Sequence, residues 1–330
     1  MPKKVLIDTD PGGDDIYSLF WLQSLMRQEV VELLAIATTE GNVSARNTFN
    51  AACQVLRLGE IDTVAVGRGV DVPDKYLTNA SHIHGDDGMG NLSQTLPPGR
   101  RRFHESLVSD DLIIRVLKAH PYEVTLVAIA PLSNLAAAEE KEPGILRLAK
   151  EVVIMGGAFN SPGNITPVAE FNMAFNPKAA QRVFASREDL VILPLDVTRQ
   201  LVFTPEMLRQ VTGLEPKNQL AQFMADLAKF LMTTTLQYRE TGGQLGFLVH
   251  DAVAVAYLVY PELFKFARAL VSIETEGRLT NGQTLCDRRH GVKTGVNAWV
   301  AEEVDAQNLL ACLVEDLHYL VERTTSYTSY

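Results

Sequence analysis

Residues 8–15, Asp-Thr-Asp-Pro-Gly-Gly-Asp-Asp, carry four carboxylates within eight positions. Asp8 and Asp10 share one face of an expected strand, because side chains in a strand alternate with a period of two. Asp14 and Asp15 fall in the first turn of an expected helix, where free N–H groups and the helix dipole favour negative charge. Helix capping accounts for one or two of these acids but not for four. The segment therefore predicts a site for a hard divalent cation or for a ligand rich in hydroxyl groups.

The Pro-Gly-Gly turn at residues 11–13 also resembles a phosphate-binding loop, because a glycine turn precedes a helix in both. This turn, however, lies among four acidic side chains and contains no lysine. Such a charge distribution repels an anion and attracts a cation. The turn is therefore expected to bring the acids together and not to hold a phosphate group.

Three other polar groups follow expected strand ends or begin a helix near one. They are residues 39–42 (Thr-Glu-Gly-Asn), residues 164–172 (Asn-Ile-Thr-Pro-Val-Ala-Glu-Phe-Asn) and residues 250–251 (His-Asp). Each group alone is typical of a turn or a helix cap. Carboxylates, amides and one imidazole gathered at one place suit a neutral hydroxylated ligand that is held on a metal ion.

Short apolar segments alternate with helical patterns along the chain, and this alternation predicts crossover connections and a mostly parallel sheet. The Val, Ile and Leu runs are continuous, as in strands that are covered on both faces. The expected strands are 5–7, 33–37, 64–66, 124–129, 152–155, 190–193, 267–274 and 295–300, and the expected helices are 14–27, 45–58, 110–119, 132–150, 177–185, 220–237, 251–260 and 307–322. We therefore expect an α/β fold with an open, mostly parallel, Rossmann-like sheet flanked by helices.

No linker or change of composition divides the chain, so we expect one domain over residues 1–323 and a flexible tail at 324–330. Two polar segments, 68–104 and 156–175, are too long to be simple connections, and long loops in such domains usually carry function. Each follows an expected strand. Both should therefore emerge at the carboxyl edge of the sheet, where open parallel sheets bind ligands.

The composition restricts the class of protein. With 46% hydrophobic and 21% charged residues among 330, the chain is not disordered. Its net charge of −10 argues against nucleic-acid binding, and three cysteines without a CxxC spacing argue against a disulfide framework. Residues 1–4 lead directly into an apolar strand without a signal-peptide pattern, and glycine and proline interrupt the longest charge-free run, 152–169. We expect a soluble, cytoplasmic protein that does not bind membranes.

Further motifs follow the acidic segment 8–15 along the chain. They are Gly41-Asn42, His84-Gly85, Pro131-Leu132-Ser133-Asn134, Met155-Gly156-Gly157, Val168-Ala169-Glu170-Phe171-Asn172, His250-Asp251, Glu274-Thr275-Glu276-Gly277-Arg278-Leu279-Thr280 and Asp287-Arg288-Arg289. In the order and spacing of these motifs, residues 3–320 resemble the inosine-uridine-preferring nucleoside hydrolase family. The resemblance implies the nucleoside hydrolase fold and Ca²⁺-dependent hydrolysis of the N-glycosidic bond of ribonucleosides, of the pyrimidine or the inosine type. It also implies a homo-oligomer, either a dimer or a tetramer.

Site residues are carried over from the family by position. The resemblance implies Asp10, Asp15, Asp251 and the carbonyl of Ile129 as Ca²⁺ ligands, and Asp10 also as the general base toward the attacking water. His250 would protonate or hydrogen-bond the departing base. The ribose and base contacts would come from Asp14, Asn42, His84, Met155, Asn164, Glu170, Asn172, Tyr238, His250 and Asp251.

Two positions depart from the family pattern. Asn176 stands before Pro177 where aspartate is usual, and a structural effect is expected there. Gly242 lies where some members carry arginine or tyrosine against the base, which leaves the base preference open. His250 argues against the purine-specific branch of the family, which stacks the base between tryptophans. Trp21 and Trp299 lie in elements unsuited to that role.

Two other interpretations remain. Residues 6–10 also match the Asp-x-Asp strand end of phosphohydrolases of the haloacid-dehalogenase type, in which Asp8 would be the nucleophile and Mg²⁺ the metal. The lysine and the late Gly-Asp-x-x-x-Asp that this chemistry needs are not found convincingly. The second alternative is a non-catalytic nucleoside- or metal-binding protein that keeps the same pocket.

Overall fold

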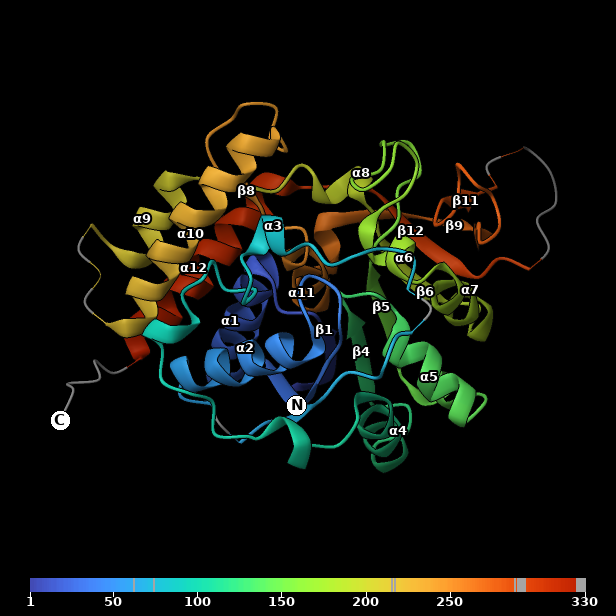
Figure 1. The fold of residues 1–330 in the computed structure, drawn as a ribbon, viewed down its shortest axis with the longest axis horizontal. Coiled ribbons are helices and arrows are strands. Elements are labelled where there is room, and N and C mark those ends of the chain that lie inside the picture. Colours follow the sequence, from blue (N-terminus) through green and yellow to red (C-terminus); the bar gives the residue numbers. More distant parts are fainter. Residues whose placement is uncertain are drawn as a thin grey trace.

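An eight-stranded sheet forms the centre of the structure, a computed structural model (Figure 1). In spatial order its strands are β3 (Ala65–Gly67), β2 (Val31–Thr38), β1 (Lys3–Thr9), β4 (Val124–Ala128), β5 (Glu151–Met155), β6 (Leu190–Leu193), β12 (Ala298–Val304) and β9 (Phe264–Ala269). All neighbours pair in parallel except β12 and β9. The expected mostly parallel α/β sheet is confirmed.

The structure describes residues 1–324 apart from 62, 74, 215, 217, 288 and 290–294. Residues 325–330, which make up most of the expected flexible tail, and Arg288 therefore lie outside the described residues. None of the helices in the described part of the chain combines the length and the apolar character needed to cross a membrane.

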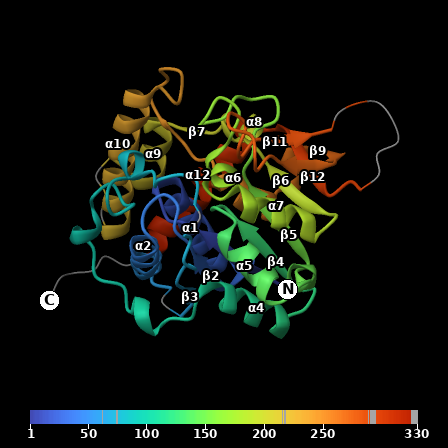
Figure 2. The same ribbon diagram turned by 45° about the vertical axis from the view of Figure 1, so that its right-hand side comes forward.

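Helices cover both faces of the sheet, as the continuous apolar strands require. In β1, Val5 and Ile7 belong to one apolar core and the intervening Leu6 to the other. The first core includes α1 (Gly13–Arg27), α2 (Ala45–Leu58), α9 (Pro205–Thr212), α10 (Gln219–Tyr238), α11 (Ala252–Val259) and α12 (Ala306–Arg323). The second includes α4 (Ser109–Ala119), α5 (Ser133–Lys141) and α7 (Pro177–Ser186), and Figures 1 and 2 show the two groups of helices on different sides.

Two predicted elements are wrong in extent. The expected helix over 132–150 ends at Lys141, because Pro143 cannot continue it and Gly144 adopts a φ of +89°. The expected strand over 267–274 is two strands. After β9, the chain enters β10 (Val271–Ile273), which pairs with β11 (Thr284–Cys286) in a separate sheet. Asn297 Oδ1 accepts the Val271 N–H at 2.8 Å, and Asn297 Nδ2 donates to the Val271 carbonyl at 2.9 Å. These two bonds separate β9 from β10.

The strand order places a ligand crevice between β1 and β4. The chain passes from β1 outward through β2 to β3, and then returns to β4 on the other side of β1. At such a reversal the connections leave in opposite directions, which opens a crevice beyond the carboxyl ends of the strands. Asp10 follows the end of β1, and Ile129 follows the end of β4.

The two long polar segments contain short helices. Segment 68–104 includes α3 (Ser81–His84), and segment 156–175 includes α6 (Phe171–Phe175). A third short helix, α8 (Leu195–Thr198), follows β6, and the two-stranded pair β7 (Val202–Phe203) and β8 (Phe247–Leu248) leads toward α11. None of these short elements was expected from the sequence, because a one-turn helix or a two-residue strand is too short to show a helical period or a continuous apolar run.

Candidate active site

A cavity of about 310 Å³ lies at the carboxyl edge of the sheet. Of the residues that the family resemblance implied, all but Asp15 contribute to its wall: Asp10, Asp14, Asn42, His84, Ile129, Met155, Asn164, Glu170, Asn172, Tyr238, His250 and Asp251. The outermost of them, Asp10 and Asp251, are 241 residues apart in the chain. Both long polar segments contribute, as expected for loops at this edge.

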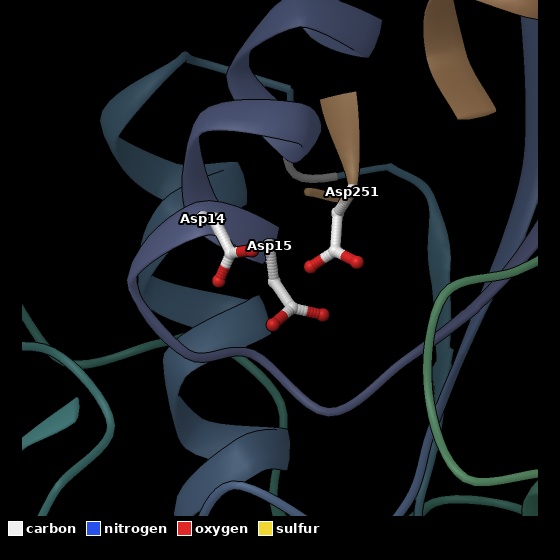
Figure 3. A group of neighbouring side chains, drawn as sticks. All are labelled: Asp14, Asp15 and Asp251. Atoms are coloured by element: carbon white, nitrogen blue, oxygen red, sulfur yellow. The ribbon is translucent and has the colours of Figure 1, made fainter. Parts of the chain in front are cut away.

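Three carboxylates meet at one side of the cavity. Asp14 and Asp15 lie in the first turn of α1, and Asp251 immediately precedes α11. One oxygen from each of the three lies within 4.8 Å of the others, and Figure 3 shows the side chains directed into one shared space. This grouping includes Asp14, which the resemblance implied as a ribose contact, and does not include Asp10, which the resemblance implied as a metal ligand.

Asp15 does not line the cavity because hydrogen bonds hold it beneath the wall. Its Oδ1 accepts from Thr9 Oγ1 at 2.6 Å, and its Oδ2 accepts from Gly12 N and Asn42 Nδ2, both at 3.0 Å. The Pro-Gly-Gly turn is thus hydrogen-bonded, through Gly12, to the first turn of α1. These bonds fix the carboxylate in one orientation and keep it fully buried.

Asp10 is held by the chain segment that follows β2. Its Oδ2 accepts the backbone N–H of Asn42 at 2.7 Å, and the Asn42 side chain donates to the Asp10 carbonyl at 3.1 Å. The Asp10 residue is 1% exposed. Its position in the cavity wall is therefore set by the Thr-Glu-Gly-Asn segment that the sequence analysis singled out.

Burial and mutual repulsion make this cluster electrostatically costly. Burial, followed by the nearby carboxylates, raises the pKa of Asp10 and that of Asp251 well above the usual range. Burial also raises the pKa of Asp15 to about 6 and that of Asp14 to about 8. No lysine or arginine is among the main influences on these four groups in the described part of the chain. Carboxylate oxygens that repel one another in this way fit a hard divalent cation, which would neutralise their charge.

The opposite wall comes from segment 156–175. Glu170 caps α6, and its two oxygens accept from the backbone N–H groups of Asn172, Gly157 and Met173 at 2.8, 3.0 and 3.1 Å. Asn172 Nδ2 donates to the carbonyls of Ile129 and Met155, both at 3.2 Å. The side chains at this wall are therefore tied to the ends of β4 and β5.

Asn164 lies at the rim of the same wall and is exposed. Its Oδ1 accepts the backbone N–H of Phe171 at 2.9 Å, which closes the loop between them. Its Nδ2 group is left to donate to a ligand in the cavity.

The side chains of His84 and His250 contribute two imidazoles to the cavity wall. His84 Nδ1 accepts the backbone N–H of Gly13 at 3.0 Å, so a neutral His84 carries its proton on Nε2. His250 Nδ1 lies 2.7 Å from Thr198 Oγ1. Burial lowers the pKa of His84 to about 4 and that of His250 to about 3. Tyr238 contacts the His82 ring edge-on, with the ring centroids 5.4 Å apart, and this pair joins α10 to α3.

Ten wall residues were not predicted as site residues: Ala80, His82, Ile83, Ile165, Phe171, Leu231, Thr235, Glu240, Phe247 and Leu248. Ile165 and Phe171 lie within the polar segment 164–172 that the sequence indicated. Leu231 and Thr235 lie four residues apart on α10, where an apolar helical stripe is normally interpreted as core. Phe247 and Leu248 form a two-residue strand that no periodicity reveals. For His82 and Ile83, the sequence indicated only that they directly precede His84 in the long polar segment 68–104.

The two departures from the family pattern lie outside the cavity wall in the described structure. Asn176 Oδ1 accepts the Ala179 N–H at 3.1 Å as the N-cap of α7, and its Nδ2 donates to Ser133 Oγ at 3.3 Å, so the contact is structural. Gly242 has a φ of +65° and open space around it. Trp21 is buried against Asp316, and Trp299 lies under Arg268, so neither faces the cavity.

Asp8 is separated from the cavity. It is completely buried, it is absent from the cavity wall, and its Oδ2 accepts from Asn134 Nδ2 at 2.7 Å. Its Oδ1 has no hydrogen-bond partner among the described residues, and burial raises the pKa of the Asp8 carboxyl to about 8. A substrate in the cavity cannot reach such a group without a rearrangement of the sheet edge.

Comparisons with known proteins give one consistent result. A family model described as inosine-uridine preferring nucleoside hydrolase matches residues 5–311. A Leishmania major protein of that name is 36% identical over 318 residues, covering 96% of this chain and 97% of the relative. A uridine nucleosidase 1 of Arabidopsis thaliana is 33% identical over 300 residues, covering 90% and 86%. The solved structure of a purine-preferring ribonucleoside hydrolase from Gardnerella vaginalis superimposes with a TM-score of 0.88 at 27% identity, covering 97% and 99%.

Proposed function

The chain belongs to the inosine-uridine preferring nucleoside hydrolase family, and from that premise we propose that it uses Ca²⁺ to hydrolyse the N-glycosidic bond of ribonucleosides. The products are the free base and ribose. The observation that carries the proposal is that carboxylates, amide-bearing loops and two imidazoles line one and the same cavity. Carboxylates suit a metal and the sugar hydroxyls, and imidazoles suit a departing base.

The donor set favours Ca²⁺ over a softer metal, because it consists of oxygen atoms. Asp10, Asp15 and Asp251, together with the Ile129 carbonyl, would hold the ion, and Asp14 is close enough to Asp15 and Asp251 to join them. The Ile129 carbonyl already accepts one hydrogen bond from Asn172 and has a second lone pair free. When bound, Ca²⁺ would order the ribose hydroxyls and make water in the site easier to deprotonate.

Asp10 is the proposed general base. Its Oδ2 is occupied by the Asn42 N–H, whereas its Oδ1 is available to take a proton from water. The N–H bond also holds the carboxylate in one rotamer, so that a water molecule beside it meets a preorganised acceptor. Removal of the proton from water supplies the nucleophile for the anomeric carbon.

The sugar carries positive charge as the bond to the base breaks. Negative or dipolar oxygens around the ring stabilise that state more than the ground state, which is the requirement for catalysis. Glu170 and Asn172 are the proposed groups on one wall, with Asp14 and Asn42 facing them, and Asn164 lies at the rim. Glu170 and Asn164 accept backbone N–H groups, and Asn42 and Asn172 donate to backbone carbonyls. These bonds keep the four side chains in place without reorganisation during the reaction.

The departing base needs a hydrogen-bond donor because a nucleobase anion is a poor leaving group. His250 is the proposed donor, with His84 and Tyr238 beside it in the wall. The Nε2–H of His84 is a fixed second donor, since Gly13 occupies its Nδ1. The contribution expected from such assistance is about 10²- to 10⁴-fold in rate.

The structure weakens the phosphohydrolase alternative. That chemistry requires Asp8 to attack phosphorus, but Asp8 is buried outside the cavity and is bonded to Asn134. The non-catalytic alternative keeps the same cavity and differs only in turnover. Kinetic measurement therefore separates it from the proposal.

The test is release of reducing sugar from uridine, cytidine, inosine and adenosine in the presence of Ca²⁺, with phosphate release from a generic phosphomonoester measured in parallel. We expect ribose from at least one nucleoside and no phosphate. Phosphate release without ribose would support the phosphohydrolase alternative. Binding of a nucleoside without turnover would support the non-catalytic one.

We extend the proposal to the organisation of the protein. Residues 1–323 would act as one catalytic domain in a cytoplasmic homo-oligomer. The family resemblance supports this extension. Analytical ultracentrifugation of the full chain tests the assembly, and a monomer at micromolar concentration would contradict it.

A further inference from the structure

A residue outside the cavity wall contacts His250, one of the two histidines proposed to meet the departing base. His250 has its Nδ1 atom 2.7 Å from the hydroxyl of Thr198, which is the last residue of α8. Thr198 itself is completely buried and is not part of the wall. With Nδ1 engaged, Nε2 is the ring nitrogen that His250 can offer to a ligand.

Two side chains that flank Thr198 in the sequence bind α8 to segment 156–175. The Asp196 carboxylate accepts the backbone N–H groups of Phe159 and Asn160 at 2.9 and 2.7 Å. The Arg199 guanidinium donates to the carbonyls of Pro162 and Gly163 at 2.7 and 2.9 Å. Thr198 thus stands between two side chains that clamp α8 to the loop leading to the cavity rim.

We propose that Thr198 is a positioning residue for the departing base: its hydroxyl donates to Nδ1 of His250 and directs Nε2–H of that ring into the cavity. This inference rests on the proposed hydrolysis of nucleosides and deepens it. A neutral imidazole has one N–H, so a donor at Nδ1 assigns that hydrogen to Nε2. Without the hydroxyl, the ring can place its hydrogen on either nitrogen and can rotate.

The kinetic test compares Thr198→Val, which keeps the shape and removes the hydroxyl, with Thr198→Ser, which keeps the hydroxyl. Thr212→Val is the matched control, because Thr212 is similarly buried but its hydroxyl bonds to Leu208 within α9. We expect kcat for the nucleoside that the wild type cleaves to fall at least about tenfold in Thr198→Val. Thr198→Ser should recover most of that loss, and Thr212→Val should remain near the wild-type rate.

Two further comparisons separate positioning from a general structural effect. In the double variant Thr198→Val/His250→Ala, the loss of kcat should equal that of His250→Ala alone within about twofold, because both substitutions remove the same interaction with the departing base. With 4-nitrophenyl β-D-ribofuranoside, whose leaving group departs without help, Thr198→Val should lose little. Additive losses in the double variant, or equal losses on both substrates, would overturn the proposal.

A direct readout does not depend on turnover. In protein labelled with ¹⁵N-histidine, the His250 signals of the wild type should show a protonated Nε2 and an unprotonated Nδ1. In Thr198→Val, the same signals should shift toward a mixture of the two neutral tautomers. A wild-type ring protonated at Nδ1 would overturn the proposal. If the wild type released no ribose from any nucleoside, the proposed function would fail, whereas the NMR result would still decide the Thr198 contact.

Discussion

Gly41 lies so close to Asp10 that a Cβ atom at position 41 would fall 2.1 Å from the Oδ2 atom of that aspartate. A carboxylate and a methyl group cannot share this space. The glycine therefore permits the chain after β2 to approach the proposed general base and to offer it the Asn42 N–H.

The first prediction follows from this contact. Gly41→Ala should displace the Asp10 carboxylate and lower kcat by about 10²-fold, because a misplacement of about 1 Å has effects of that size. Gly242→Ala is the control, since an added Cβ there meets nothing, although its positive φ carries a small stability cost. Steady-state ribose release checks both variants. Equal activity of Gly41→Ala and wild type would mean that the Asp10 position is unimportant.

The second prediction concerns the metal. Purified protein should contain Ca²⁺, and a strong chelator should abolish activity and lower the Tm, because the Asp14, Asp15 and Asp251 carboxylates repel one another without a cation. A ligand that binds only the folded state stabilises it by mass action, so adding Ca²⁺ back should restore both properties. Elemental analysis and thermal unfolding are the measurements. Full activity in chelator, with no calcium found, would refute the metal assignment.

The third prediction concerns Asp8. Its carboxyl is buried outside the cavity, and its raised pKa of about 8 keeps it protonated at neutral pH, so Asp8→Asn is nearly isosteric with the native state. We expect a folded protein with activity within about tenfold of wild type, since no step of the proposed reaction uses Asp8. Circular dichroism and ribose release are sufficient to check this. A total loss of activity in a folded variant would revive Asp8 as a nucleophile.

The fourth prediction concerns the sugar. The cavity wall offers the half-buried Asp14 and the buried Asn42 and Glu170 to the ribose, and a missing hydroxyl leaves such polar groups without a partner. Uridine should exceed 2′-deoxyuridine in kcat/KM by roughly 10⁴-fold or more. Parallel progress curves for the two substrates give the ratio. Similar values for both would show that the 2′-hydroxyl is not recognised.

The fifth prediction concerns the base. His250→Ala should lower kcat for inosine more than for uridine, because hypoxanthine offers N7 to a donor, whereas uridine depends more on stabilisation of the sugar. If His250 only shapes the cavity, both substrates should fall by a similar small factor, mainly through KM. Separate kcat values for the two nucleosides distinguish these outcomes.

The sequence was most informative where chemistry and regular structure coincide. Asp10 and Asp15 could be assigned to the site because one follows a buried strand and the other lies in the first turn of the next helix. Asn172 could be assigned because its polar segment follows a strand. Thr198 and Glu240 could not be placed, since a four-residue helix and a turn leave no periodic signal. The division of the expected strand 267–274 depends on the side chain of Asn297, which arrives from a distant part of the chain.

The role of Asp10 tests the account most directly. We would measure kcat in wild type and in Asp10→Asn for the nucleoside that the wild type cleaves fastest, both proteins loaded with Ca²⁺, and confirm by circular dichroism that the variant is folded. The account predicts turnover by the wild type and a loss of at least about 10³-fold in the variant, because the amide cannot take the proton from water. A wild type that binds nucleosides but releases ribose from none of them, or a variant that releases it at a near-normal rate, would contradict the account.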